Sequence, residues 1–197
     1  MTANQNNTNP LLKILSVSLV VLILDQVTKI LTKNFMTLRE SKQIIGDTVR
    51  LTFIENDGMA FGIAIGNKLL FNLFSIIAAA AILWYLIKLR NEHLLPRFAL
   101  AIIFGGAIGN LFDRIVHGRV VDFMDINIPD IPSLNLFLFS TPPMNRWPIF
   151  NVADVAVSIG MVLLIGTLFT STSIWQEYEP GAEPATVDEK AGSESRT

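Results

Sequence analysis

The chain of 197 residues is 51% hydrophobic and only 16% charged, with a formal net charge of −2. Soluble domains typically carry about 25% charged residues, so this composition indicates a membrane protein with one compact bundle. The near-neutral charge gives no support for nucleic-acid binding. The sequence has no cysteine, which excludes disulfides and thiol catalysis, and its two histidines are too few for a histidine-built metal site.

Four segments are long and apolar enough to predict transmembrane helices, which makes the expected fold an α-helical polytopic membrane protein. They cover residues of about 11–31, 69–87, 98–112 and 152–175. Gly105 and Gly109 form a G-x-x-x-G motif in the third segment, which permits close packing of a neighbouring helix. We expect one membrane-embedded domain over 1–175, followed by a disordered, acidic, cytoplasmic tail over 176–197.

The loop between the second and third helices is short and basic, with Lys88, Arg90 and Arg97. The positive-inside rule places this loop in the cytoplasm, although the long connections carry basic residues too. Both termini are then cytoplasmic. The long connections, 32–68 and 113–151, share the outer face of the membrane with the adjoining helix ends.

The two long connections contain alternating patterns that are typical of strands with one buried face. In the first, apolar residues stand at 49, 51 and 53 with polar residues between them. In the second, leucines stand at 134, 136 and 138, with prolines on both sides. We therefore predict a small sheet on the outer membrane surface.

Asp122 and Asp154 are carboxylates set in apolar sequence. Charges beside the hydrocarbon cost free energy and usually mark a functional site. Two neighbouring carboxylates share a proton, so that one can activate water as a general base while the other polarises a carbonyl group. The alternative is that Asp122 ends a strand and Asp154 caps the fourth helix, although Asn151 is the better candidate for that cap.

Other polar residues have simpler structural interpretations. Asp25 and Lys29 have the spacing of an ion pair on one helix face. Asp113 and Arg114 close the third helix, where they can satisfy each other or nearby backbone groups. The segment that begins at Asn56 is typical of a turn, and its amide can alternatively hold an extended peptide. Lone acids at 125 and 130 compete with the pair, but nothing in their context favours them.

Five short motifs occur in one order along the four spans. They are Asp25-Gln26-x-x-Lys29, Asn56-x-Gly58-x-Ala60-Phe61, Gly106-Ala107-x-Gly109-Asn110-x-x-Asp113-Arg114, Val121-Asp122-Phe123 and Phe150-Asn151-x-Ala153-Asp154. Each motif is weak alone, but the ordered set resembles the bacterial lipoprotein signal peptidases. These are the type II signal peptidases, a family of aspartic membrane proteases.

The resemblance implies four helices with a small extracytoplasmic β-cradle and a short periplasmic helix. It also implies a multi-pass enzyme of the bacterial plasma (inner) membrane, whose active site lies near the outer face. Such an enzyme is an aspartic endopeptidase that removes signal peptides from prolipoproteins, cutting before a cysteine that carries a diacylglyceryl group. By the same resemblance we expect inhibition by globomycin-type cyclic peptides. We expect a monomer in contact with membrane lipid, with no metal, no cofactor and no nucleic-acid partner.

The resemblance also assigns roles to residues of this chain. The catalytic pair corresponds to Asp122 and Asp154. The residues expected to bind substrate or support the pair are Asp25, Lys29, Asn56, Gly58, Asn110, Asp113, Arg114 and Asn151.

One feature departs from the family pattern. The stretch between the two aspartates is longer than the family leads us to expect, with a proline-rich insertion within 125–149 that can form a lid or a partner surface. Two other classes of protein remain as rivals. A proton- or ion-coupled transporter would use Asp25, Asp113 and Asp154 as a relay, and a structural adaptor would need none of these acids.

Overall fold

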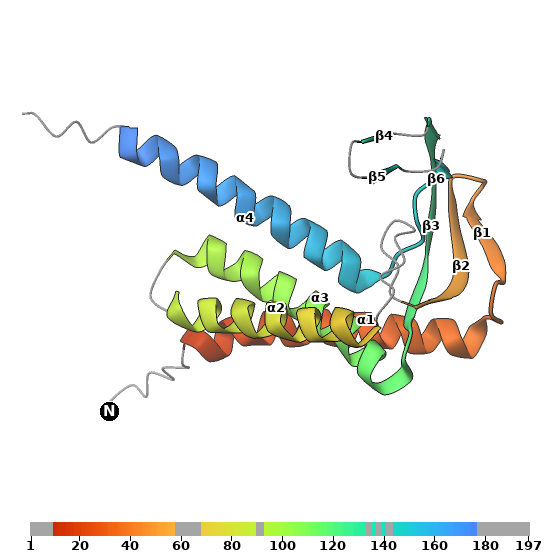
Figure 1. Cartoon of the computed structure of the whole chain (residues 1–197), viewed down its shortest axis with the longest axis horizontal. Helices are drawn as coiled ribbons and strands as arrows, with labels where there is room; N and C mark the ends of the chain where they lie inside the picture. Colours follow the sequence, from red (N-terminus) through yellow and green to blue (C-terminus); the bar gives the residue numbers. More distant parts are fainter. Residues whose placement is uncertain are drawn as a thin grey trace, which may run out of the picture.

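The computed structural model describes residues 10–57, 68–89, 93–132, 135–136, 139–140 and 144–176. Its four helices are α1 (Pro10–Phe35), α2 (Lys68–Lys88), α3 (Leu94–His117) and α4 (Val152–Gln176). Figure 1 shows the helices extending from one end of the molecule, where the strands gather. The predicted helical membrane fold with a small sheet is confirmed.

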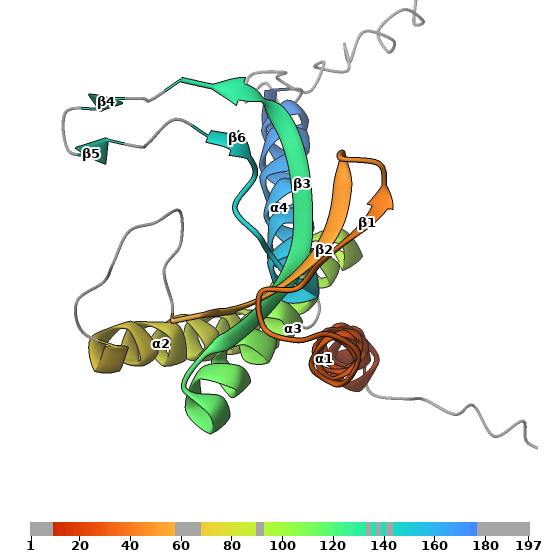
Figure 2. The ribbon, with the colours of Figure 1, turned by 90° about the vertical axis from the view of Figure 1, so that its right-hand side faces the viewer.

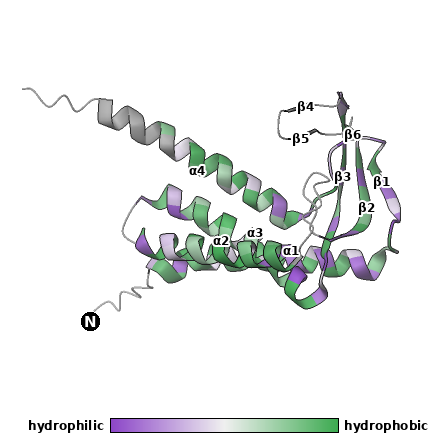
Figure 3. Cartoon of the chain, viewed as in Figure 1, coloured by the Kyte–Doolittle hydropathy of each residue, from purple (hydrophilic) through white to green (hydrophobic). Residues whose placement is uncertain are grey.

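The helices have the composition of membrane spans. Three of the described segments, Pro10–Phe35, Leu69–Lys88 and Leu94–His117, are long and apolar enough to cross a membrane, and the apolar part of α4, Val152–Thr167, is shorter. Hydrophobic residues predominate along the helices (Figure 3). Many of the large ones are exposed, as at Leu69 and Val162, which are 76% and 69% exposed. Such surfaces are stable against hydrocarbon and unfavourable in water.

Helix α3 is longer at both ends than the predicted span of 98–112, and α1 continues beyond residue 31. The polar residues that interrupt the apolar run at the end of α3 do not end the helix, because they find partners inside the protein. The helix ends at Gly118 instead. This residue adopts a left-handed conformation with φ 74°, and its N–H donates to the Arg114 carbonyl at 3.1 Å.

Glycines let α3 lie close to its neighbours at the centre of the bundle. A Cβ atom at Gly105 would lie 2.6 Å from the Ser18 carbonyl oxygen of α1, and one at Gly109 would lie 2.5 Å from Asp25 Oδ2. The close packing predicted from the G-x-x-x-G motif is therefore confirmed. Gly106 likewise allows α3 to lie close to α4, because a Cβ atom added at Gly106 would lie 2.5 Å from the Ala153 carbonyl oxygen.

The larger sheet has the strand order β1-β2-β3-β6 (Figure 2). Its strands are β1 (Ser41–Ile45), β2 (Val49–Asn56), β3 (Val120–Ile131) and β6 (Met144–Arg146), with antiparallel neighbours. The strand predicted from the alternation at 49–53 is confirmed as β2, whose Phe53 packs in a core with Val121 and Phe123. The register between β2 and β3 pairs Ile54 with Asp122.

The proline-rich insertion contains a separate two-stranded sheet, β4 (Asn135–Leu136) and β5 (Phe139–Ser140). The alternation at 134–138 predicted one strand, but β4 and β5 are antiparallel partners. Residues 134, 137 and 138 lie outside the described residues, as do Gly58, Ala60 and Phe61 of the second motif and the predicted tail from residue 177.

Candidate active site

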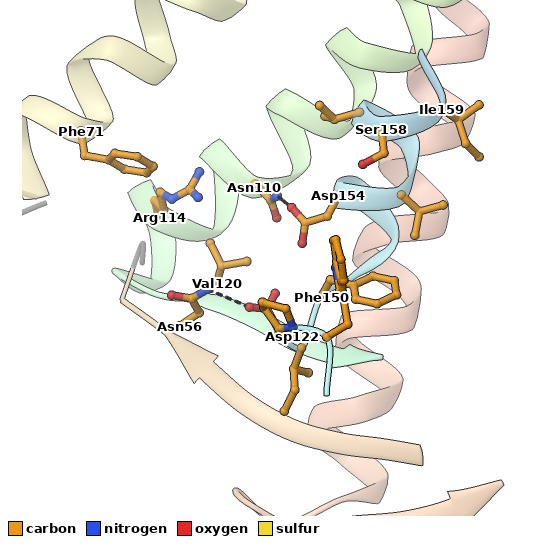
Figure 4. A pocket seen from close by; sticks show the side chains of 15 residues that line it. Asn56, Phe71, Asn110, Arg114, Val120, Asp122, Phe150, Asp154, Ser158 and Ile159 are labelled. Atoms are coloured by element: carbon orange, nitrogen blue, oxygen red, sulfur yellow. Dashed lines mark hydrogen bonds between the residues drawn. The ribbon is translucent and has the colours of Figure 1, made fainter. Parts of the chain in front are cut away.

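Asp122 and Asp154 line one cavity of about 490 Å³, although they come from different elements. Asp122 belongs to β3, and Asp154 lies in the first turn of α4. The cavity lies where these two elements meet the end of α3 (Figure 4). Its other lining residues are Asn56, Phe71, Asn110, Arg114, Val120, Trp147, Pro148, Ile149, Phe150, Val155, Val157, Ser158 and Ile159.

The Asp122 carboxylate is almost fully buried, with only 1% of the residue exposed. Its Oδ1 accepts a hydrogen bond from Asn151 Nδ2 at 2.6 Å, and its Oδ2 accepts one from Asn56 Nδ2 at 2.9 Å. Burial disfavours the charged form more than these amides stabilise it, and the nearby Asp154 charge acts in the same direction as burial. The pKa of Asp122 is therefore raised from 3.8 to about 6.

The Asp154 carboxylate also accepts two N–H groups. Asn110 Nδ2 donates to its Oδ1 at 2.8 Å, and the backbone N–H of Asn151 donates to its Oδ2 at 3.1 Å. Figure 4 shows the Asn110 and Asp154 side chains pointing toward each other from α3 and α4. Asp154 thereby satisfies a backbone N–H at the start of α4.

Asn151 connects the two carboxylates. Its Oδ1 accepts the backbone N–H of Asp154 at 3.1 Å, which makes Asn151 the N-cap of α4. Its Nδ2 lies 2.6 Å from Asp122 and 3.1 Å from Asn110 Oδ1. The sequence-based preference for Asn151 as the cap is confirmed, and Asp154 completes the reciprocal bond of a capping box.

Behind the cavity lies a buried charged cluster. The Lys29 ammonium is 2.8 Å from Asp25 Oδ2, which confirms the predicted ion pair, and 2.7 Å from Asp113 Oδ2. Asp25 Oδ1 accepts the backbone N–H of Ala153 at 3.0 Å, so it also satisfies a donor in the first turn of α4. None of the three charged groups lines the cavity.

Asp113 and Arg114 do not pair with each other. Successive helical residues point about 100° apart, and here Asp113 turns to Lys29 while Arg114 faces the cavity. The Arg114 guanidinium lies 4.7 Å from the centre of the Phe71 ring. Its Nε is buried and has no hydrogen-bond partner among the described residues. Arg114 thus places a cationic group in the cavity wall.

The competing acids lie elsewhere. Asp125 pairs with Arg146 through an Nε–Oδ1 distance of 2.6 Å and accepts the Thr52 hydroxyl at 2.7 Å, and it does not line the cavity. Asp130 is exposed. In the described part of the chain, no group of three or more acidic or histidine side chains forms a candidate metal site.

Sequence reasoning did not select the apolar residues of the cavity wall. Phe71 lies near the start of α2, and Trp147 precedes the last motif. An isolated aromatic residue in an apolar segment gives no local signal that distinguishes a cavity wall from a lipid-facing surface. Only the tertiary structure identifies them, because α2 packs against α3 and Trp147 lines the same cavity as residues of α4.

Two carboxylates line one cavity at the end of a bundle of apolar helices, and the protein is a membrane protein. The comparison with known families assigns it to a class of proteases. Residues 17–170 match the family model described as signal peptidase (SPase) II, and the chain belongs to that family.

Curated relatives and solved structures agree with this assignment. The chain is 40% identical over 161 residues to the lipoprotein signal peptidase of Syntrophus aciditrophicus, which covers 79% of this chain and 91% of the relative. It is 35% identical over 163 residues to the Staphylococcus aureus lipoprotein signal peptidase, with 83% and 91% covered. A solved bacterial membrane enzyme superposes with a TM-score of 0.66 at 31% identity, over 86% of this chain and 94% of the other. The transporter and adaptor alternatives lose their support.

Proposed function

We propose that this chain removes signal peptides from diacylglyceryl-modified prolipoproteins, cutting before the lipidated cysteine. One observation carries the proposal. The carboxylates of Asp122 and Asp154 line a single cavity, and each accepts two N–H donors. The name shared by the relatives, lipoprotein signal peptidase, supports the choice of substrate.

The proposed reaction needs one water molecule and one proton shared by the carboxyl pair. The ionised carboxylate removes a proton from water while the hydroxide oxygen attacks the carbonyl carbon of the scissile amide. The protonated carboxyl then donates to the amide nitrogen as the carbon–nitrogen bond breaks. The products are a free carboxylate on the signal peptide and a free amine on the cysteine. We assign the acid and base roles to the pair and not to either aspartate alone.

Arg114 is suited to the negative charge that develops during this reaction. Arg114 lines the cavity, and its guanidinium is held 4.7 Å from the centre of the Phe71 ring. A preorganised donor near a developing oxyanion lowers the barrier because no reorganisation is needed at that moment. Arg114 therefore has the proposed role of binding the carbonyl oxygen under attack.

The cavity wall along α4 suits a lipidated substrate that arrives within the membrane. Val155, Val157 and Ile159 line it, and Ile159 is 50% exposed. We place the cavity near the outer face of the bacterial plasma membrane, with both termini in the cytoplasm, because the connection between α2 and α3 is flanked by the basic residues Lys88 and Arg97. The same cavity is the proposed binding site for a globomycin-type peptide, and the proposed functional unit is a monomer.

The test is cleavage of a purified prolipoprotein carrying a diacylglyceryl cysteine, in detergent or nanodiscs. Wild type should cut before that cysteine. Asp122→Asn and Asp154→Asn should each lose at least about a thousandfold in kcat while remaining folded, since each removes an acid–base group. Asp130→Asn, which changes an exposed acid outside the cavity, is the matched control. Turnover near wild type in either cavity variant would contradict the dyad, and no cleavage by folded wild type would contradict the function.

A further inference from the structure

Lys29 lies outside the cavity, but it contacts Asn110, whose amide donates a hydrogen bond to Asp154. Its side chain is only 3% exposed, and its ammonium lies 2.9 Å from Asn110 Oδ1. The opposite end of that amide, Asn110 Nδ2, lies 2.8 Å from Asp154 Oδ1. One small side chain therefore links a buried cation on α1 to a carboxylate on α4.

The chemistry of Lys29 decides which way the Asn110 amide points. An ammonium has three donors and no acceptor, so the amide atom that faces it must be the oxygen. Asn151 reinforces this orientation, because its Nδ2 donates to the same Asn110 oxygen at 3.1 Å. The Asn151 amide is itself oriented by the backbone N–H of Asp154, which can only donate. With its oxygen occupied by two donors, Asn110 presents its N–H toward Asp154.

Lys29 in turn is held in place by two carboxylates. The ammonium donates to Asp25 Oδ2 at 2.8 Å and to Asn110 Oδ1 at 2.9 Å, and it forms an ion pair with Asp113 Oδ2 at 2.7 Å. Asp25 is further fixed by the backbone N–H of Ala153, the residue before Asp154. The cluster thus positions the lysine relative to the turn of α4 that carries the carboxylate.

We propose that Lys29 is a positioning residue for peptide hydrolysis, which holds the Asn110 amide with its N–H toward Asp154 and so aligns that carboxylate in the cavity. The inference rests on the proposed function, but it concerns a residue that cannot touch the substrate in the cavity. The competing explanation is that Lys29 only neutralises Asp25 and Asp113. That explanation predicts a loss of stability alone. Any effect of changing Lys29 on kcat would then be the same with or without the Asn110 amide.

A double-mutant cycle on the cleavage rate separates these two explanations. Lys29→Met keeps the apolar stem and removes the donor, and Asn110→Ala removes the amide. Lys29→Met should lower kcat roughly 10- to 100-fold with KM within about twofold, because a misplaced catalytic group slows chemistry. In the Asn110→Ala background, Lys29→Met should lower kcat by less than about twofold further. Losses that multiply fully in the double variant would overturn the proposal.

A charge-balanced variant keeps the test valid if Lys29→Met alone folds poorly. Lys29→Met combined with Asp113→Asn removes one positive and one negative charge, so the net charge of the cluster is unchanged. Asp113→Asn alone is its matched control, since it retains the lysine. The combined variant should show the kcat loss and its dependence on Asn110, whereas equal kcat in the combined variant and the control would contradict the positioning role.

A second measurement reports the amide directly and does not depend on cleavage. In protein labelled with ¹⁵N-asparagine, the side-chain NH₂ signals of Asn110 are those that disappear in Asn110→Ala. Changing Asp154 to Asn should shift these signals when Lys29 is present. The same substitution should cause a smaller shift in the Lys29→Met background. An unchanged response would overturn the inference even if cleavage is as proposed. Conversely, the expected response without cleavage by wild type would overturn the proposed substrate and leave the positioning role supported.

Discussion

The backbone N–H groups of Asn151 and Asp154 each donate to the other residue's side chain, both at 3.1 Å. This reciprocal pair begins α4 and also fixes one of the two carboxylates in the cavity. The same Asn151 side chain donates to Asp122 at 2.6 Å. The cap of a helix and the geometry of the candidate dyad are therefore one arrangement, and a change at Asn151 affects both.

The two roles of Asn151 can be separated by comparing serine with alanine. Serine at this position still caps the helix but cannot reach Asp122 with an amide N–H, whereas alanine does neither. We expect Asn151→Ser to be more stable than Asn151→Ala by about 1 kcal/mol, the usual worth of an N-cap. Both variants should lose at least about 100-fold in kcat, because Asp122 loses the same donor. Thermal unfolding and cleavage rates check the two parts, and a serine variant with wild-type kcat would contradict the role at Asp122.

The stability of the protein should carry a pH dependence that comes from Asp122. Its pKa is raised from 3.8 to about 6 in the folded state, chiefly by burial, so the folded protein binds this proton more tightly than the unfolded chain. Stability from this group is therefore full below pH 4 and falls as pH rises through 6, by roughly 3 kcal/mol at most.

Asp122→Asn, which cannot ionise, should remove that dependence. Its melting temperature relative to wild type should rise between pH 4 and pH 7, whatever constant offset the substitution adds. Asp130→Asn, at an exposed position, should follow wild type across the range. A melting-temperature difference between Asp122→Asn and wild type that stays flat with pH would show that Asp122 does not titrate in this window.

Gly106 should tolerate no side chain. A Cβ there would lie 2.5 Å from the Ala153 carbonyl oxygen, which is backbone and cannot turn away. Gly106→Ala should push α4 from α3 and displace Asp154, which costs roughly 1–3 kcal/mol of stability and at least about tenfold in kcat.

Gly166 of the same bundle provides the control, because an added Cβ would meet no atom within 4 Å. Gly166→Ala should be neutral or stabilising by up to about 1 kcal/mol, since alanine favours the helix. Equal behaviour of the Gly106 and Gly166 variants in unfolding and cleavage assays would contradict the packing argument.

The ion pair between Arg146 and Asp125 should matter for the sheet. Asp125 is 7% exposed in its side chain, and the pair joins β6 to β3. Arg146→Gln should cost roughly 1–3 kcal/mol, because it leaves a buried carboxylate without its cation. Arg119→Gln is the matched control. Arg119 is 52% exposed where it pairs with Glu55 and Asp57, so its loss should cost below about 1 kcal/mol in the same unfolding measurement.

The local sequence pattern was sufficient to predict the existence of the helices and of β2, and to select Asp122 and Asp154 as the acids of interest. Long apolar runs predict spans because hydrocarbon excludes unpaired backbone groups. Asp122 and Asp154 stand out for the same reason, as charges in apolar sequence. The pattern failed at helix ends, as in α3, which begins at Leu94 and continues beyond residue 112 to His117.

The sequence by itself therefore determined the membrane fold, the family and the two acids of interest, because hydropathy and ordered motifs are properties of neighbouring residues. The tertiary structure alone decided which groups meet. Asp113 contacts Lys29, whereas the adjacent Arg114 lines the cavity. Asp125 forms an ion pair outside the cavity. The Asn110 amide lies between Lys29 and Asp154 and contacts both. The physical reason is that helix rotation and strand register set the direction of each side chain, and hydrogen-bond partners distant in sequence then fix its orientation.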